Sequence, residues 1–312
     1  MRLPNFIIIG AAKSGTTTLY EYLCQHPNVF MCTPKEPNFF ANNENYSQGI
    51  EWYAKLFQKA QPNQIIGEAT TSYTHRLHLL NIPERIYRVM PNVKLIYIMR
   101  HPVDRAYSQY VQQIKIFQSK HRIENLEPFK VPETFEQLLQ RGKKVIETDD
   151  YMEQIDVLAA SNYLNIIEQY LQIFPKKSLL FLLLEDLIAQ PQETMNKVCD
   201  FLEIDRQINL ETEKTIKANT AIHHKTWYVR SRITAPLKAI PGVANVAQVL
   251  PQGVRDGVYS MLKKLPYQKQ VEREYVPKPM RPETRHLLLK QFQKPNQKLS
   301  QFLDRDLSHW SN

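Results

Sequence analysis

Residues 6–17, with the sequence FIIIGAAKSGTT, join a short apolar run to a glycine-rich turn and the start of a helix. The run Phe6–Ile9 is typical of a strand that is buried on both faces of a parallel sheet. After the turn, Leu19, Tyr22 and Leu23 recur at the spacing of one helix face. Because the first N–H groups of a helix and its dipole point at such a turn, this order of elements predicts a cradle for an anion.

The glycine turn has the spacing of a P-loop but not its lysine position. Four residues separate Gly10 from Gly15, and Thr16 stands where the P-loop lysine would follow. The lysine lies inside the turn instead, at Lys13. A nucleoside triphosphate needs that lysine together with magnesium to neutralise its terminal phosphates, so this turn favours a less highly charged group. An ordinary glycine turn is the alternative, but the crowding of lysine, serine and threonine favours an anion site.

The rest of the chain alternates between apolar strand-like runs and amphipathic helical stretches. Further strands are predicted at Ile65–Gly67, Val93–Met99 and Ser178–Leu184. Helices are predicted at residues 17–25, 83–90, 162–174 and 192–202, and from residue 102 onward. Such alternation indicates a parallel sheet covered by helices on both faces. The predicted fold is therefore α/β, a P-loop-type parallel sheet flanked by helices in a single domain with a basic C-terminal subregion.

A second basic point follows the strand that ends at Met99. Arg100 stands at the carboxyl end of that strand, where open α/β sheets bind their ligands. Ser108 lies two helical turns further on and is expected to face the same anion, since an arginine fork with a hydroxyl suits a phosphate monoester. A pair between Arg100 and Asp104 is an equally good interpretation of the arginine alone. Asp104 with Arg105 is expected to lock the loop.

The composition is that of a globular protein with a basic balance. The 312 residues are 43% hydrophobic and 10% aromatic, which excludes a disordered chain and a fibrous repeat. Lys and Arg number 40 against 31 Asp and Glu, a net charge of +9. An anionic partner is therefore expected, and the charge alone leaves open nucleic acid, a lipid head group or a small phosphorylated ligand.

The compartment is predicted from the N-terminus and the cysteines. The start of the chain has too short an apolar run for a signal peptide, and no apolar run approaches the roughly 18 residues that span a bilayer. Cys24, Cys32 and Cys199 form no C-x-x-C pair and are expected to be packing residues. These features predict a cytoplasmic protein without a transmembrane segment. They do not fix its oligomeric state.

The charge is concentrated in one part of the chain. Residues 214–269 contain ten Lys or Arg and one acid, Asp256. An amphipathic helix resumes over residues 282–310 and is expected to dock back on the core. We therefore predict a cofactor-binding core over residues 1–210, a basic lid-like subregion over 211–281 and a docking C-terminal helix over 282–312.

Five motifs in order resemble the sulfotransferases that use 3′-phosphoadenosine 5′-phosphosulfate (PAPS). They are AAKSGTTTLYEYLCQHPNVF (11–30), TPKEPNFF (33–40), IGEATTSY (66–73), KLIYIMRHPVDRAYSQY (94–110) and QFLDRDLSHW (301–310). The resemblance covers nearly the whole chain. It is strongest to the bacterial stand-alone enzymes and to the glycosaminoglycan branch, which includes the heparan sulfate enzymes.

The resemblance implies a PAPS-dependent sulfotransferase that needs no metal. The residues that it implies for the 5′-phosphosulfate are Lys13, Ser14, Gly15, Thr16 and Thr17. Lys13 would also stabilise charge on the bridging oxygen. Arg100 and Ser108 match the pair that binds the 3′-phosphate, and adenosine 3′,5′-bisphosphate would be the product.

Two acidic residues are candidates for a role in catalysis, Glu36 and Glu68. Glu36 matches the catalytic base of the glycosaminoglycan branch, and a carboxylate beside Phe39 and Phe40 would have its pKa raised by desolvation. A charge at a helix N-terminus or a surface acid is the alternative for Glu36. Glu68 is expected to orient the acceptor or to be a structural partner of Arg100 or Lys13.

The sequence departs from that branch at two places. Ala69 stands where the branch often has a lysine, and the Lys-Gly-Arg loop near the C-terminus is absent. Lys225 and Arg230 are expected to replace that loop over a phosphate. Tyr163 falls where the family has a tyrosine near the cofactor, with a core position as the alternative.

The sequence leaves three functions open. The leading one transfers a sulfuryl group in line to an acceptor hydroxyl or amine on a carbohydrate, lipid-like or small-molecule acceptor. A P-loop kinase using Mg-ATP is the alternative, with Asp186 as a magnesium acid after a strand, or else as a helix N-cap. A basic module binding nucleic acid or membranes is the non-enzyme alternative, but no nucleic-acid-binding motif accompanies the basic segment.

Overall fold

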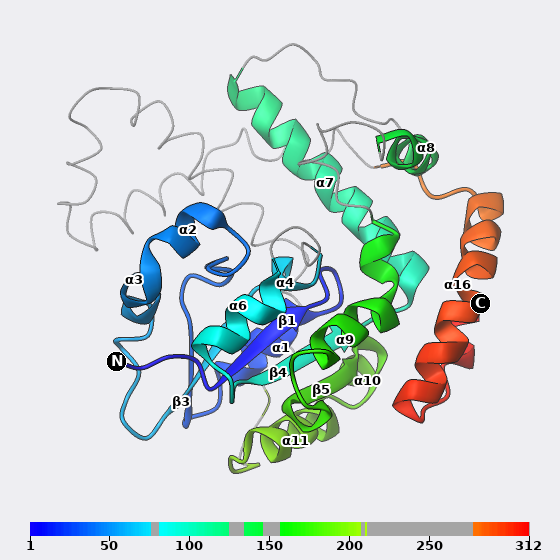
Figure 1. Cartoon of the computed structure of the whole chain (residues 1–312). Helices are drawn as coiled ribbons and strands as arrows, with labels where there is room; N and C mark the ends of the chain where they lie inside the picture. The colour runs from blue at the N-terminus through cyan, green and yellow to red at the C-terminus, as the bar shows by residue number, and fades with distance from the viewer. Residues whose placement is uncertain (76–80, 125–133, 146–156, 207–209, 211–276, 312) are drawn as a thin grey trace.

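The computed structural model describes residues 1–75, 81–124, 134–145, 157–206, 210 and 277–311. Its centre is a parallel sheet of five strands in the order β2-β3-β1-β4-β5 (Figure 1). The strands are β1 (Phe6–Gly10), β2 (Val29–Met31), β3 (Ile65–Ala69), β4 (Lys94–Met99) and β5 (Leu179–Leu183). Helices cover both faces, so the predicted α/β fold is confirmed.

The strand register brings the carboxyl ends of β1, β3, β4 and β5 to one edge of the sheet. Phe6 in the central β1 lies opposite Gly67 of β3 and Lys94 of β4. β4 and β5 run in register from Leu95 and Leu179 to Met99 and Leu183. Since all pairs are parallel, the loops that follow these strands gather at the same edge, where ligands of open α/β sheets bind.

The helices of the core follow the predicted alternation with shifted ends. α1 (Thr16–Leu23), α6 (Ile82–Val89), α7 (Pro102–Glu124), α9 (Tyr163–Leu171) and α11 (Pro191–Leu202) were expected from the sequence. The sequence did not predict five further helices, which are α2 (Asn43–Ser47), α3 (Gly49–Lys55), α4 (Ser72–His75), α8 (Phe135–Val145) and α10 (Leu184–Ala189). β2 was missed as well, because three residues after the His26–Pro27 break carry too little pattern to predict a strand.

Alternating side chains of β1 feed two separate cores. Ile7 and Ile9 are fully buried in a cluster with α3, α6 and α9. Phe6 and Ile8 belong to a second cluster with α1, α10 and α11. Each face of the sheet therefore has its own apolar layer, which explains why the strand is a continuous apolar run.

The C-terminal helix α16 (Pro282–Leu303) packs against α7 and α9 along one side of the molecule (Figure 1). Leu288 and Phe292 are buried in a cluster with α7 and α8, and Leu299 is buried in the cluster that contains α9. The helix thus packs against the core. The division into a core, a basic subregion and a docking helix stays a prediction, because residues 211–276 lie outside the described part.

The burial of the cysteines and the apolarity of the helices relate to the predictions about packing thiols and transmembrane segments. Cys32 and Cys199 are buried packing residues, whereas Cys24 is exposed, so the prediction that all three pack is wrong for Cys24. Cys24 is the C-cap residue of α1, where the helix ends. Within the described ranges, no helix combines the length and apolarity needed to cross a membrane.

Candidate active site

The glycine turn between β1 and α1 lies at the carboxyl edge of the sheet. Gly15 has a φ of 87°, which favours glycine, and a Cβ at that position would lie 2.5 Å from Leu184 Cδ1, so any larger residue would require this leucine side chain to move. Lys13 also has a positive φ, of 70°. α1 begins at Thr16, and its first backbone N–H groups therefore face the turn. This geometry fits the anion cradle that the sequence predicts.

A cavity of about 470 Å³ opens beside this turn and collects most of the predicted residues. The predicted residues that line it are Lys13, Gly15, Thr16, Thr17, Glu36, Arg100 and Ser108. Ser14 is fully buried and is not among the lining residues. Lys225 and Arg230 lie outside the described residues.

Arg100 lies directly after β4 and reaches the turn. Its Nη1 donates to the Lys13 carbonyl oxygen at 3.3 Å. The Tyr163 hydroxyl donates to the Arg100 carbonyl at 2.7 Å and accepts from the Arg100 N–H at 3.4 Å. Burial raises the pKa of Tyr163 to about 12, so this hydroxyl keeps its proton. Tyr163 is thus a core residue that holds the arginine backbone.

Asp104 and Arg105 have partners other than Arg100. Asp104 accepts from Arg285 of α16 at 2.7 Å, so the alternative pairing with Arg100 is wrong. The Arg105 side chain is fully buried, and it donates to Ser161 Oγ at 2.6 Å and to the carbonyl oxygen of Val157. These contacts hold the start of α7, which also carries Ser108.

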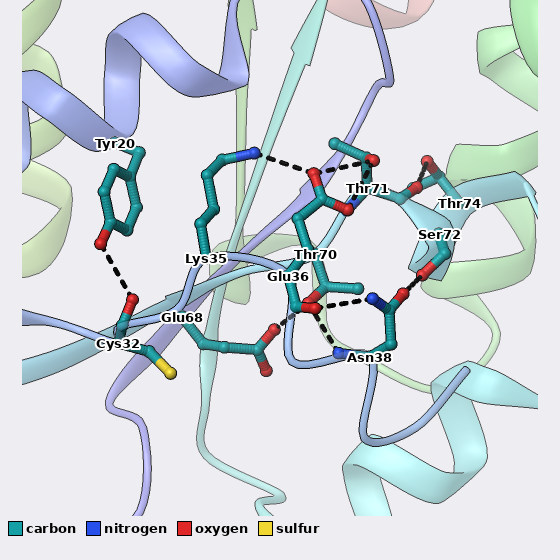
Figure 2. A network of polar contacts seen from close by, with 10 residues as sticks. All are labelled: Tyr20, Cys32, Lys35, Glu36, Asn38, Glu68, Thr70, Thr71, Ser72 and Thr74. Carbon is teal, nitrogen blue, oxygen red and sulfur yellow. Dashed lines mark hydrogen bonds and ion pairs between the residues drawn. The ribbon is translucent and has the colours of Figure 1, made fainter. Parts of the chain in front are cut away.

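Glu36 sits at a left-handed position of the loop that follows β2 (Figure 2). Its φ is 63°, and its N–H donates to the Ala69 carbonyl at 3.0 Å. The carboxylate pairs with Lys35 Nζ at 2.8 Å and accepts from the Thr71 hydroxyl at 3.1 Å. Non-glycine residues rarely adopt this backbone conformation, and such outliers cluster at functional sites.

The expected apolar surroundings of Glu36 are not found. Phe39 stacks on Tyr53 with ring centroids 4.4 Å apart, and Phe40 packs edge-on against Tyr73. Both phenylalanine rings are buried in the core, whereas the Glu36 side chain is 34% exposed and has polar partners. Residues three and four positions away in the sequence therefore do not surround the Glu36 carboxylate, which has Lys35 and Thr71 as its partners.

Glu68 is the buried carboxylate of the site. Near the end of β3, it accepts from Tyr53 at 2.5 Å, from Tyr73 at 3.2 Å and from the Thr70 hydroxyl. Burial raises the pKa of Glu68 to about 7, and the three hydroxyl donors oppose that rise. Its hydrogen-bond partners are these hydroxyls, and not the Arg100 or Lys13 that the sequence suggested.

Thr70 connects Glu68 to the loop that carries Glu36 (Figure 2). The Thr70 hydroxyl donates to Glu68 and accepts from the Asn38 N–H at 3.4 Å. The Asn38 side chain in turn donates to the Glu36 carbonyl at 2.6 Å. The loop is therefore held against the end of β3 by side chains as well as by backbone.

The cavity also contains residues that the sequence analysis did not single out. Lys35 adjoins Glu36, Thr71 follows β3, and Gln112 lies one helical turn after Ser108. Each of these three lies within four residues of a predicted site residue, and this proximity in the sequence could have identified them. Nothing in the sequence marked the residues of the apolar wall, which are Tyr22, Leu184, Leu187, Ile188 and Pro191.

The acids after β5 are engaged by the C-terminus. Asp186 forms a bidentate pair with Arg305, and Glu185 accepts from Trp310 Nε1 at 3.2 Å. Asp186 lies inside the first turn of α10, whose N-cap is Leu183, so the N-cap interpretation is wrong. Among the described residues, no group of three or more His, Cys, Asp or Glu is arranged to hold a metal ion.

The model of the sulfotransferase domain family matches residues 3–234. The chain belongs to this sulfotransferase family. Heparan sulfate glucosamine 3-O-sulfotransferase 5 from Homo sapiens is 33% identical over 208 residues, which are 67% of this chain and 56% of that protein. Membrane-associated sulfotransferase kil1 from Dictyostelium discoideum is 40% identical over 149 residues, 47% of this chain and 29% of that protein.

The fold of this sulfotransferase family member also matches a solved structure. The crystal structure of a sulfotransferase from Alicyclobacillus acidocaldarius aligns with a TM-score of 0.62 at 20% identity and covers 100% of both chains. At this identity the match supports the fold alone. The chain spans about half the length of the curated relatives that it matches.

Proposed function

We propose that this chain transfers a sulfuryl group from PAPS to an acceptor hydroxyl or amine. The observation that supports the proposal is that Lys13, Arg100 and Glu36 come from three separate loops and line one cavity. Two of them are cations beside a helix N-terminus, as a ligand with several anionic groups requires. The third is a carboxylate, as deprotonation of an acceptor requires.

The residues of the cavity fit the proposed donor. PAPS, when bound, supplies the activated sulfuryl group. Lys13, with the backbone N–H groups around Thr16 and Thr17, would hold the 5′-phosphosulfate and stabilise the charge that develops on the leaving oxygen. Arg100 and Ser108 would hold the 3′-phosphate, since a guanidinium and a hydroxyl converge on the same cavity.

Glu36 is the proposed general base. Its carboxylate is partly exposed toward the cavity and is oriented by Lys35 and Thr71. A base must lie within hydrogen-bond reach of the acceptor proton, and an exposed carboxylate on a fixed loop meets that need. Glu68 is fully buried beneath the loop, and we propose for it a structural role toward the loop and not direct contact with the acceptor.

The acceptor class stays open within this proposal. The heparan sulfate relatives are named for transfer to glucosamine. Ala69 stands where the glycosaminoglycan branch often has a lysine, so carbohydrate, lipid-like and small-molecule acceptors belong in the same screen. Three free cysteines favour a reducing compartment, and we propose the cytoplasm on that ground.

The test combines ligand binding with an acceptor screen. The chain is incubated with PAPS and panels of carbohydrate, lipid and phenolic acceptors, and mass spectrometry detects products that have gained a sulfuryl group. Glu36→Gln is expected to reduce turnover at least about a hundredfold, within the range for losing a general base. It should leave the Kd for adenosine 3′,5′-bisphosphate within about twofold, because the base does not hold the nucleotide.

Two further variants separate the roles. Glu44→Gln alters an exposed acid outside the cavity and should change neither turnover nor binding. Arg100→Ala should weaken bisphosphate binding by about tenfold or more, because a charged hydrogen-bond donor is lost. A fully active Glu36→Gln would refute the base. A wild-type chain that is stabilised by Mg-ATP and not by the bisphosphate would refute the proposed donor.

A further inference from the structure

The C-terminal motif QFLDRDLSHW is expected from the family resemblance, yet no residue of it lines the cavity. Its last tryptophan, Trp310, is 1% exposed and lies against Tyr163, with ring centroids 5.8 Å apart. Its indole N–H donates to Glu185 Oε1 at 3.2 Å. Trp310 therefore contacts both α9, through Tyr163, and the start of α10, through Glu185.

Both partners of Trp310 hold the backbone at the end of β4. Glu185 Oε1 also accepts from the His101 N–H at 2.9 Å, and His101 directly follows Arg100. Tyr163 contacts the Arg100 N–H and carbonyl through its hydroxyl. One side chain therefore supports the two groups that fix the direction in which Arg100 leaves the strand.

Arg305 attaches the C-terminal motif to the start of α10 a second time. Its guanidinium forms the bidentate pair with Asp186, the residue next to Glu185 at the start of α10. That pair is partly exposed, with side-chain exposures of 40% for Arg305 and 26% for Asp186. Leu184 of the same helix contacts Gly15 and lines the cavity. The C-terminal motif thus contacts the first turn of α10, which lies against the glycine loop through Leu184 and binds the backbone next to Arg100 through Glu185.

We propose that Trp310 and Arg305 are positioning residues for Arg100, and that the C-terminal motif sets the recognition of the nucleotide 3′-phosphate from behind the cavity. The inference rests on the proposed function, because it takes Arg100 as the 3′-phosphate ligand. A wrongly directed guanidinium loses its hydrogen bonds to a phosphate even when the protein stays folded. The effect should therefore be specific to ligands that carry this phosphate.

The test measures Kd for two nucleotides, adenosine 3′,5′-bisphosphate and adenosine 5′-monophosphate, by titration calorimetry. Trp310→Phe keeps an aromatic ring against Tyr163 and removes the N–H that binds Glu185. It should weaken bisphosphate binding by about tenfold, the size expected for one hydrogen bond to a charged group. Monophosphate binding should stay within about twofold. A ratio of the two Kd values that is unchanged from wild type, whether or not both affinities fall, would overturn the inference.

Controls separate positioning from general destabilisation. Trp52→Phe makes the same exchange in α3, where Trp52 packs on Phe39 away from the cavity, and it should leave the ratio unchanged. If Trp310→Phe does not fold, Arg305→Gln tests the contact between the C-terminal motif and α10 at its partly exposed ion pair with Asp186. It should lower the preference for the bisphosphate over the monophosphate about threefold. A wild-type ratio in Arg305→Gln would then overturn the inference.

The proposed function and the inference fail in different ways. A wild-type chain that binds the two nucleotides equally refutes Arg100 as the 3′-phosphate ligand, and the inference falls with it. If Arg100→Ala loses the preference for the bisphosphate while Trp310→Phe retains it, the proposed function stands and the positioning role of Trp310 is overturned.

Discussion

At the scale of single residues, Gly15 and Gly49 share a positive φ and differ in what surrounds them. Gly15 has a φ of 87°, and a Cβ there would lie 2.5 Å from Leu184 Cδ1. Gly49 has a φ of 80°, and nothing lies within 4 Å of such a Cβ. Both alanine variants bear the backbone penalty, which is about 1 kcal/mol. Only Gly15→Ala adds a steric clash with a neighbouring side chain.

We expect Gly15→Ala to lower the free energy of unfolding by about 2–4 kcal/mol, because overpacking adds to the backbone strain. Gly49→Ala should lower it by about 1 kcal/mol. Urea denaturation followed by circular dichroism measures both. Equal losses in the two variants would show that the close approach of Leu184 to the glycine turn contributes nothing.

Thr71 offers a second test, because its hydroxyl is the nearest neutral donor to Glu36. The Oγ1 atom lies 3.2 Å from Glu36 Oε1 and 3.1 Å from Oε2. Thr71→Val removes the donor and keeps the shape. We expect kcat to fall about tenfold, as for losing a hydrogen bond to a charged group, with an unchanged Kd for adenosine 3′,5′-bisphosphate.

The matched control for this variant is Thr194→Val, which alters a buried threonine of α11 outside the cavity. It should leave kcat unchanged at a temperature where the protein is folded. A loss of kcat of the same size in both variants would mean that Thr71 acts through stability alone, and not through the orientation of Glu36.

At the scale of elements, the strands and helices of the central α/β alternation were largely predictable, whereas β2, the short helices and α8 were not. The apolar runs of β1 and β4 and the glycine turn are enough to predict that Lys13, Arg100 and Ser108 lie at one edge of the sheet, where all three line the cavity. β2 has three residues, and α10 follows β5 without a break, so neither has a period that could be recognised. Partners such as Thr71 and Glu36, 35 residues apart, depend on the strand register, which the local sequence does not carry.

The same limit applies to Glu68, whose burial comes from three elements at once. Tyr53 belongs to α3, Tyr73 to α4 and Thr70 to the loop between β3 and α4, and all three donate to one carboxylate. Burial raises its pKa from 4.5 to about 7 in the folded chain. The folded state therefore holds this proton more tightly than the unfolded state does.

The sign of the resulting pH dependence follows from linkage. Between pH 4.5 and about 7 the folded state keeps the proton and the unfolded state loses it. The contribution of Glu68 to stability is thus complete below pH 4.5, falls as the pH rises, and is lost above about pH 7. We expect wild type to lose on the order of 3 kcal/mol relative to Glu68→Gln across this window.

Urea denaturation at a series of pH values measures this difference. Subtracting the glutamine variant removes the titration of the other groups, and Glu193→Gln, an exposed acid of α11, serves as the control. Parallel stability curves for wild type and Glu68→Gln would contradict the raised pKa.

At the scale of the whole molecule, two groups of basic residues stand out behind the net charge of +9. Lys13, Lys35 and Arg100 converge on the cavity, where a ligand with several anionic groups is proposed. The basic excess between residues 214 and 269 lies outside the described residues. The proposed nucleotide would account for the cations of the cavity, and the basic module stays an alternative only for residues 214–269.

The attachment of α16 decides whether the chain unfolds as one unit. Its ion pair between Arg285 and Asp104 is partly exposed, with side-chain exposures of 37% and 38%. Such pairs contribute up to about 1 kcal/mol. Phe292 is 3% exposed and packs in the cluster that α16 shares with α7 and α8. Apolar contact, and not the ion pair, should therefore hold the helix to the core.

We expect Phe292→Ala to lower the free energy of unfolding by about 3–5 kcal/mol and Arg285→Gln by less than about 1 kcal/mol. If α16 belongs to the same cooperative unit as the sheet, far-ultraviolet circular dichroism and tryptophan fluorescence should report one coincident transition in both variants. The chain has three tryptophans, so an earlier fluorescence transition in Phe292→Ala that disappears when Trp310 is also replaced by phenylalanine would instead mean that α16 detaches first and carries Trp310 away from Glu185. Loss of 3′-phosphate recognition would then precede unfolding of the sheet, because Arg100 would lose its support while the glycine turn remained intact.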